Sequence, residues 1–183
     1  MSFLRSLEPE PGLLQIFQAF PEVARPLLKY HEVLLRGESP FSAAERELIP
    51  AYVSVLNNCN YCRAVHSQTA IALGIRADLI PQLLANPQSK DLDPRLRPVL
   101  AFVRKLTVSP GKITAKDADE FLAAGWNDRA LHDATAICAL FNLMNRLVNG
   151  FGVDAPESYT KLAAERLAEG GYAQLLNFLP RTR

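Results

Sequence analysis

Apolar residues recur every three or four positions through most of this sequence, and proline or glycine ends each such stretch. This spacing places the apolar side chains on one face of a helix. The strict alternation of apolar and polar residues that is typical of a half-buried strand is not found at convincing length. The sequence therefore predicts an all-α fold, a helical bundle, and its 183 residues are enough for one domain with a sizeable core.

The expected helices follow from their apolar stripes and from the residues that stop them. We expect helices over residues 22–35, 43–57, 58–73, 78–84, 93–107, 128–149 and 156–168. Ser42 and Glu45 match the capping-box pattern at the start of the second helix. We interpret residues 1–183 as a single domain, with a core at about 20–153 and a C-terminal helical extension over 154–183.

Two of these helices carry clear buried stripes. In the second helix the stripe contains Leu48, Ala51, Tyr52 and Val55. In the longest helix it contains Ile137, Cys138, Phe141, Met144 and Val148. We expect these residues to pack in the core of the bundle.

Charge and composition exclude several classes of partner. A net charge of +1 and a pI near 7.7 produce no strong field, so we expect neither nucleic acid nor a membrane surface as a partner. The N-terminus lacks the apolar core of a signal peptide, and no apolar run approaches the roughly 18 residues that a membrane span needs. We therefore expect a cytoplasmic protein, in which three cysteines favour metal, redox or core roles over a disulfide framework.

Two cysteines and a histidine lie at helical spacing in "NNCNYCRAVHSQ", residues 57–68. On a helix that begins near residue 58, Cys59, Cys62 and His66 point to the same side. Cys59 lies in the first turn, where free amides and the helix dipole stabilise a thiolate. His66 follows Cys62 by one turn and can accept its proton. The spacing therefore concentrates ionisable groups on one surface.

Several interpretations of this stretch remain open. A c-type haem site requires a histidine where this chain has Arg63, and a thioredoxin-like site requires a preceding strand. A zinc site needs a fourth ligand, which Glu47, His31 or His132 can supply. Otherwise we treat His31 and His132 as ordinary helix residues. The remaining alternative is a pair of core cysteines without chemistry.

Glu47 favours a catalytic interpretation. A short turn at Asn57 and Asn58 would fold the two flanking helices back on each other, and Glu47 would then lie near His66. A carboxylate that bonds to an imidazole orients the ring and raises its basicity. The alternative for Glu47 is an exposed charge in the stretch "AERE".

The spacing of these residues resembles that of a known family. Four residues follow one another at defined intervals in an all-α chain: Glu47, Cys59, Cys62 and His66. This pattern resembles the alkyl hydroperoxidase D (AhpD) family within the carboxymuconolactone decarboxylase superfamily. The resemblance is strongest over residues 42–74, and "LFNLMNRLVNGFGV" at 140–153 is similar to the second half of the peroxidase-related branch.

The resemblance implies an AhpD-like fold and a role for each of the four residues. Cys62 would attack the peroxide, Cys59 would resolve the sulfenic acid as a disulfide, and His66 and Glu47 would relay protons. One position departs from the pattern, because the founding members have a histidine between the cysteines where this chain has Tyr61. The departure bears on proton delivery to Cys59 and on the reductant.

The resemblance also implies a cofactor-free activity and its partners. The expected enzyme is a thiol-dependent peroxidase that reduces hydrogen peroxide or organic hydroperoxides without haem, flavin or metal. Its reductant would be a dithiol or a thioredoxin- or lipoyl-type protein. The enzyme would form a homo-oligomer. The alternatives are a lactone decarboxylase, as in the superfamily's other branch, and a redox-sensing or zinc-stabilised helical interaction module.

A polar stripe on the longest helix has two interpretations. It consists of Asn142, Asn145, Arg146 and Asn149. Asparagine is a poor helix former in interior positions unless it caps or bonds something. The stripe therefore either faces solvent or another subunit, or lines the site. Cys138 lies in the apolar stripe of the same helix, and we expect it to be a core residue.

Overall fold

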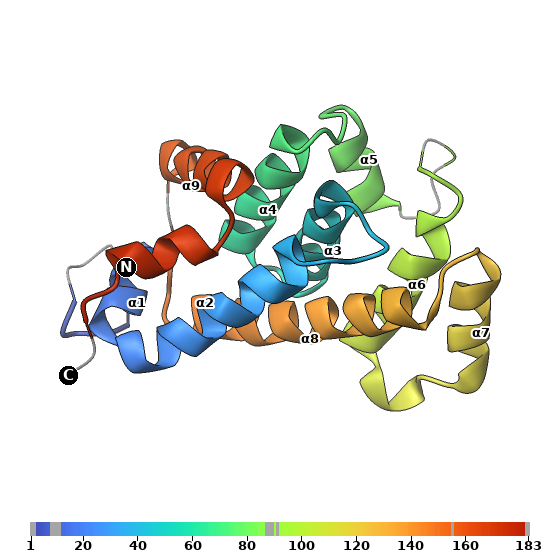
Figure 1. Ribbon diagram of the computed structural model, residues 1–183, viewed down its shortest axis with the longest axis horizontal. Helices are drawn as coiled ribbons and strands as arrows, with labels where there is room; N and C mark the ends of the chain where they lie inside the picture. The colour runs from blue at the N-terminus through green and yellow to red at the C-terminus, as the bar shows by residue number, and fades with distance from the viewer. Residues whose placement is uncertain (1–2, 8–11, 87–89, 91, 155, 182–183) are drawn as a thin grey trace.

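All regular structure in the described residues is helical (Figure 1). The computed structural model describes residues 3–7, 12–86, 90, 92–154 and 156–181. Its α-helices are α1 (Leu13–Ala19), α2 (Pro21–Arg36), α3 (Ala43–Leu56), α4 (Asn60–Ala72), α5 (Leu79–Ala85), α6 (Leu96–Val108), α7 (Ala115–Ala123), α8 (Asp128–Gly150) and α9 (Glu157–Gly170). Two short 3-10 helices are η1 (Pro110–Lys112) and η2 (Ala173–Phe178). The prediction of an all-α fold is confirmed.

Each helix expected from the sequence is present. The capping box forms at the start of α3, where the Glu45 amide donates to Ser42 Oγ at 3.2 Å and the Ser42 amide donates to Glu45 Oε2 at 2.7 Å. Helix α4 begins later than predicted. Asn58 has a φ of 52°, in the left-handed region, and therefore lies in the turn and outside the helix.

Two of the α-helices, α1 and α7, were not predicted. α1 has 7 residues and α7 has 9, so neither shows an apolar repeat long enough to identify it. In α7 only Phe121 is buried. Asp117 stabilises the start of α7, because its Oδ2 accepts hydrogen bonds from the Thr114 amide and hydroxyl, each at 2.7 Å.

Helices α3, α4 and α8 form the centre of the bundle. α3 packs against both α4 and α8, and α8 runs along one side of the molecule (Figure 1). All five residues predicted for the α8 stripe are buried. In α3 three of the four predicted residues are buried, whereas Val55 near the helix end is half-buried. The apolar stripes thus identified the core, with an error where α3 leaves it.

The C-terminal part of the chain returns to the N-terminal helices. α9 packs against α4, and η2 packs against α2 (Figure 1). Gln18 Nε2 donates to the Phe178 carbonyl at 3.0 Å, and the Arg25 guanidinium donates to the Pro180 carbonyl at 2.5 Å. Residues 156–181 therefore cover one end of the bundle, next to α1 and α2.

Some apolar side chains remain on the surface. Val23, Tyr30 and Val33 share the outer face of α2, with exposed fractions of 61%, 48% and 62%. Leu143 of α8 is also exposed. Over the described part of the chain, no helix has both the length and the hydropathy needed to cross a bilayer.

Candidate active site

A fully buried carboxylate lies at the centre of the site. Glu47 of α3 has no solvent exposure. Its Oε2 lies 2.6 Å from His66 Nδ1 of α4. Its Oε1 accepts hydrogen bonds from Arg36 Nη2 at 2.6 Å and from the Tyr172 hydroxyl at 2.9 Å. The contact between Glu47 and His66 that the helical hairpin predicts is therefore formed, and two further donors complete the network.

The α3–α4 hairpin positions these groups. The chain reverses at Asn57 and Asn58, and the Cys59 amide donates to the Ser54 carbonyl at 2.9 Å. The sequence suggested that Cys59 lies in the first turn of α4. In the structure Cys59 is instead the N-cap residue, just before that turn. Cys62 lies within the first turn of α4, and His66 follows it by four residues on the same side.

The network keeps Glu47 ionised. Burial alone would raise the pKa of its carboxyl, but the hydrogen bond and charge of His66 and the charge of Arg36 outweigh burial and lower it. Because a carboxylate only accepts hydrogen bonds, His66 Nδ1 carries the proton that they share. In the neutral ring Nε2 then holds the lone pair. His66 is therefore oriented to accept a proton at Nε2.

The two candidate thiols form a coupled pair. Cys59 and Cys62 are both buried and unbridged. The hydrogen bond from Cys62 lowers the pKa of Cys59, whereas the same bond and burial raise the pKa of Cys62. The hydrogen bond between the sulfurs thus favours the thiolate at Cys59, with the Cys62 thiol as the donor. A proton acceptor is required before Cys62 becomes a nucleophile.

Asn145 is the member of the polar stripe that reaches the site. Its side chain is buried and favours the ionised form of both sulfurs, which adds to the lowering of the Cys59 pKa by Cys62 and partly opposes the rise in the Cys62 pKa. Its Nδ2 donates to Ser54 Oγ at 3.0 Å, and its Oδ1 accepts from Asn57 Nδ2 at 3.0 Å. These contacts tie α8 to the α3–α4 turn.

The rest of the stripe lies outside the site. Asn142 bonds the Cys138 carbonyl at 3.0 Å and also accepts from Asn57 at 3.1 Å. Arg146 and Asn149 are exposed. Both alternatives for this stripe were thus partly right, because it runs from the thiols to the surface along one helix. Cys138 is fully buried, as expected, and its thiol lies 3.3 Å from the Thr107 hydroxyl.

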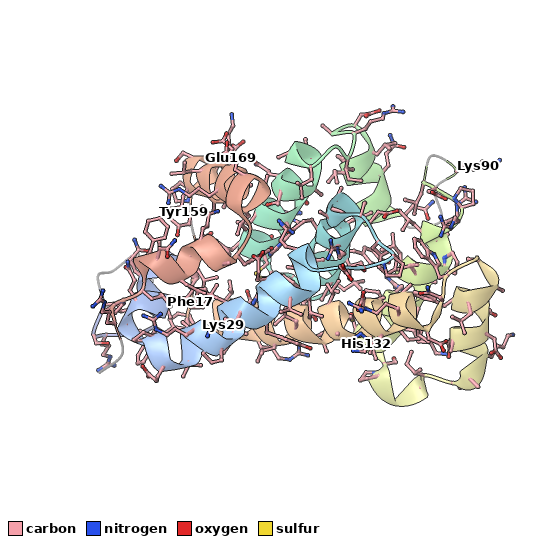
Figure 2. All side chains as sticks on the ribbon, viewed as in Figure 1. Phe17, Lys29, Lys90, His132, Tyr159 and Glu169 are labelled. Carbon is pink, nitrogen blue, oxygen red and sulfur yellow. The ribbon has the colours of Figure 1, made fainter. Side chains whose placement is uncertain are left out.

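A cavity of about 100 Å³ adjoins Cys62. It lies between α1, α2, α4, α8, α9 and η2, and both Cys62 and His66 line it. Cys59 is not among the lining residues. Figure 2 labels two lining residues from distant parts of the sequence, Phe17 of α1 and Tyr159 of α9, at the same end of the molecule. Most of the wall is aliphatic or aromatic, so the site is an apolar chamber with a few polar groups.

Sequence reasoning missed three residues of the site: Arg36, Tyr172 and His31. Arg36 and Tyr172 contact Glu47, and His31 lines the cavity. Tyr172 follows a glycine pair, and Gly171 has a φ of 64°. Glu32 Oε2 accepts the amides of Tyr172 and Ala173 at 2.7 and 2.8 Å, which holds this turn in place. These contacts join segments up to 141 residues apart, and no local pattern indicates them.

The described residues provide no set of ligands for the zinc alternative. Within the ranges that the structure describes, no three His, Cys, Asp or Glu side chains are grouped so that they could hold a metal ion. His132 lies toward the α7 end of α8, away from the cavity (Figure 2). It is exposed, and its Nδ1 contacts Asp133 at 2.9 Å. His132 is therefore the ordinary helix residue that the sequence indicated.

The sequence matches the model of the carboxymuconolactone decarboxylase family over residues 21–105. This span contains the α3–α4 hairpin with Glu47 and both cysteines. It ends before α8 and the C-terminal segment. No curated protein sequence matches the chain.

Crystal structures of several proteins share the fold. A peroxidase-related protein from Silicibacter sp. TM1040 is 26% identical with a TM-score of 0.73, over 86% of this chain and 92% of that chain. An uncharacterized peroxidase-related protein from Ralstonia eutropha JMP134, described as an alkylhydroperoxidase AhpD core, is 25% identical with a TM-score of 0.75, over 82% and 78%. The debrominase Bmp8 is 18% identical with a TM-score of 0.70, over 83% and 82%.

These matches, together with the helical hairpin and its two cysteines, place the chain among all-α proteins of the carboxymuconolactone decarboxylase type. Within that class, the chain is an AhpD-like member of the carboxymuconolactone decarboxylase superfamily.

Proposed function

We propose that this protein is a thiol-dependent peroxidase that uses Cys59 and Cys62 as a dithiol/disulfide couple. One observation carries the proposal: Cys62 lines an apolar cavity beside His66, whose imidazole is bonded to the buried Glu47 carboxylate. A nucleophile, a base and a group that orients the base are thus assembled around a space for a small substrate. The name of the Ralstonia eutropha relative agrees with this activity.

The first step consumes the peroxide. The Cys62 thiolate attacks the terminal oxygen of the hydroperoxide, so that an S–O bond forms and the O–O bond breaks. The departing alkoxide takes up the proton that Cys62 released and leaves as an alcohol. His66 Nε2 accepts and returns this proton, while Glu47 stabilises the charged ring.

The second step closes the disulfide. The Cys59 thiolate attacks the sulfenic sulfur of Cys62, an S–S bond forms, and the hydroxyl leaves as water after it gains a proton. This attack requires Cys59 as a thiolate, and in the reduced pair the hydrogen bond of Cys62 lowers the pKa of the Cys59 thiol, which favours that form. A dithiol or a thioredoxin- or lipoyl-type protein then returns two electrons and two protons.

The same dithiol can be tested on a second substrate class. The debrominase Bmp8 has been crystallised with 2,3,4-tribromopyrrole, and an apolar, aromatic-lined cavity beside a thiol suits a halogenated ring. Replacing carbon-bound bromine by hydrogen uses two thiols and yields a disulfide, a proton and bromide. This reaction is the comparison arm of the assay.

The test is a steady-state assay of peroxide consumption with a panel of dithiol donors. We expect turnover with hydrogen peroxide or tert-butyl hydroperoxide, and mass spectrometry should show that one peptide containing both cysteines has lost two hydrogens. Bromide release from tribromopyrrole without peroxide turnover would replace the proposal by a debrominase. Protein that keeps both thiols after either treatment would exclude dithiol chemistry and favour a decarboxylase or a non-catalytic module.

A further inference from the structure

The imidazole of His31 faces the cavity and has no role in the relay. His31 is 3% exposed and lines the cavity together with Cys62 and His66. Its ring packs edge-on against Phe141, with centroids 5.7 Å apart, and tilted against Tyr172 at 5.2 Å. A polar ring at this position, on a wall that is otherwise mainly apolar, calls for a chemical explanation.

The hydrogen bond of one ring nitrogen determines the state of the other. His31 Nδ1 lies 2.8 Å from the Leu27 carbonyl oxygen, which can only accept, so Nδ1 carries a proton. Burial lowers the pKa of His31 to about 4, so the ring is neutral near pH 7. In a neutral ring protonated at Nδ1, Nε2 holds a lone pair. Among the described residues, no hydrogen-bond donor reaches this Nε2.

The cavity has the size and polarity for a small organic molecule. Its volume is about 100 Å³, somewhat less than the roughly 150 Å³ of an engineered apolar cavity that holds benzene in another protein, and therefore of the order that a small organic molecule needs. Leu13, Phe17, Leu28 and Met144 contribute apolar wall. The lone pair of His31 Nε2, in addition to that of His66 Nε2, favours a ligand that carries an O–H or N–H group, because only such a ligand satisfies an acceptor in this wall.

We infer that this cavity binds a small, mainly apolar molecule with a hydroxyl-type donor, such as an organic hydroperoxide or the matching alcohol, and that His31 Nε2 accepts the hydrogen bond. The assignment of that molecule as substrate rests on the proposed function. Arg166 and Leu162, which line the cavity and are exposed on α9, mark its opening. His31 is a recognition residue in this account, distinct from His66, whose Nδ1 is held by Glu47.

Two probes of similar shape test the inference without turnover. Phenol carries the donor, and fluorobenzene replaces it with a group that cannot donate. Their affinities for the reduced protein and for His31→Phe are measured by NMR titration. We expect the ratio of phenol to fluorobenzene affinity to fall about tenfold or more in His31→Phe, since the variant keeps a ring and loses the acceptor. An unchanged ratio overturns the inference, as does failure of both probes to bind at millimolar concentration.

A second measurement uses the unmodified protein and does not depend on how the variant folds. In ¹⁵N-labelled protein, the Nε2 resonance of His31 should shift on addition of phenol and stay in place with fluorobenzene. Equal responses to both probes contradict hydrogen bonding at this atom. Peroxide assays separate the two proposals. Selective phenol binding without peroxide turnover rejects the peroxidase function alone, whereas turnover without selective phenol binding rejects the role of His31 alone.

Discussion

Glu47 Oε2 and His66 Nδ1 lie 2.6 Å apart on two antiparallel helices, and both residues are buried. Glu47 is ionised, because the hydrogen bond of His66, the charge of the ring when it is protonated and the charge of Arg36 outweigh burial and lower the pKa of the carboxyl. A carboxylate in this position makes the far ring nitrogen a better proton acceptor. Removing the charge while keeping the shape therefore tests the relay directly.

Glu47→Gln should slow peroxide reduction by about 10²- to 10⁴-fold, the usual contribution of general-base assistance. The loss should be partly recovered at higher pH, where the thiol ionises unaided. Rates are measured from pH 5 to 10 beside Glu165→Gln, an exposed acid on α9 that should behave as wild type. A Glu47→Gln enzyme with wild-type rate and pH profile would mean that the carboxylate has no part in proton transfer.

Glu47 should also shape stability at acid pH. Its pKa is lower in the folded protein than in the unfolded chain, so its stabilising contribution is present above the unfolded value of about 4.3 and is lost as pH falls through the folded value. Urea denaturation of wild type and Glu47→Gln between pH 3 and 7 measures this contribution. The difference in unfolding free energy between the two proteins should shrink toward pH 3; a constant difference would contradict the pKa shift.

Substitution of each of the two cysteines should affect activity in a different way. Cys62→Ser should abolish turnover, because it removes the thiol that lines the cavity. Cys59→Ser should permit one attack and then stop at the sulfenic acid, which a dimedone adduct detected by mass spectrometry would report. Cys138→Ser is the matched control, since this thiol is buried beside Thr107, and it should keep activity. The reverse pattern would exchange the roles of Cys59 and Cys62.

Tyr172→Phe isolates the contribution of the C-terminal segment. The variant keeps the ring against His31 and removes the hydroxyl that donates to Glu47 Oε1. Loss of this bond should cost about 1 to 3 kcal/mol in unfolding free energy, and the rate should fall less than in Glu47→Gln because Arg36 and His66 still hold the carboxylate. Denaturant melts and initial rates give both values. A larger rate loss than that of Glu47→Gln would assign Tyr172 a direct part in proton transfer.

The exposed apolar face of α2 should take part in assembly. Val23, Tyr30 and Val33 lie together on that face, and burial against another copy removes them from water. Light scattering at micromolar concentration should report a mass well above the 20.2 kDa of one chain. Val33→Glu should reduce that mass, whereas Lys116→Glu on α7, also exposed, should not. A monomeric wild type would reject the oligomer.

The sequence predicted the part of the site that depends on short-range order. Ser42 with Glu45 marks the start of α3, and helical spacing aligns Cys62 with His66 on α4. A tight turn between two helices leaves little freedom, so the approach of Glu47 to His66 follows from the spacing. The same helical reasoning identified most of the α8 core stripe.

The rest depends on long-range packing. Tyr172 bonds to Glu47, from which it is separated by 125 positions in the sequence. This contact requires the placement of α9, the positive φ of Gly171 and the hydrogen bond from the Tyr172 amide to Glu32. No local periodicity encodes such a path. The sequence indicated that His31 is an ordinary helix residue, because its neighbours on α2 show nothing unusual. Its position on the cavity wall depends on residues of other helices, which form the rest of that wall.

The division of the cavity between two parts of the chain separates reaction from selection. The dithiol, His66 and Glu47 all belong to the α3–α4 hairpin, whereas Tyr159, Arg166 and several other lining residues come from the C-terminal segment. Replacing side chains on α9 can therefore reshape which molecules enter while the sulfur chemistry stays intact. An engineer who wishes to redirect this scaffold to a new substrate can begin with the side chains that α9 contributes to the cavity, and His31 of α2 is a further position to vary.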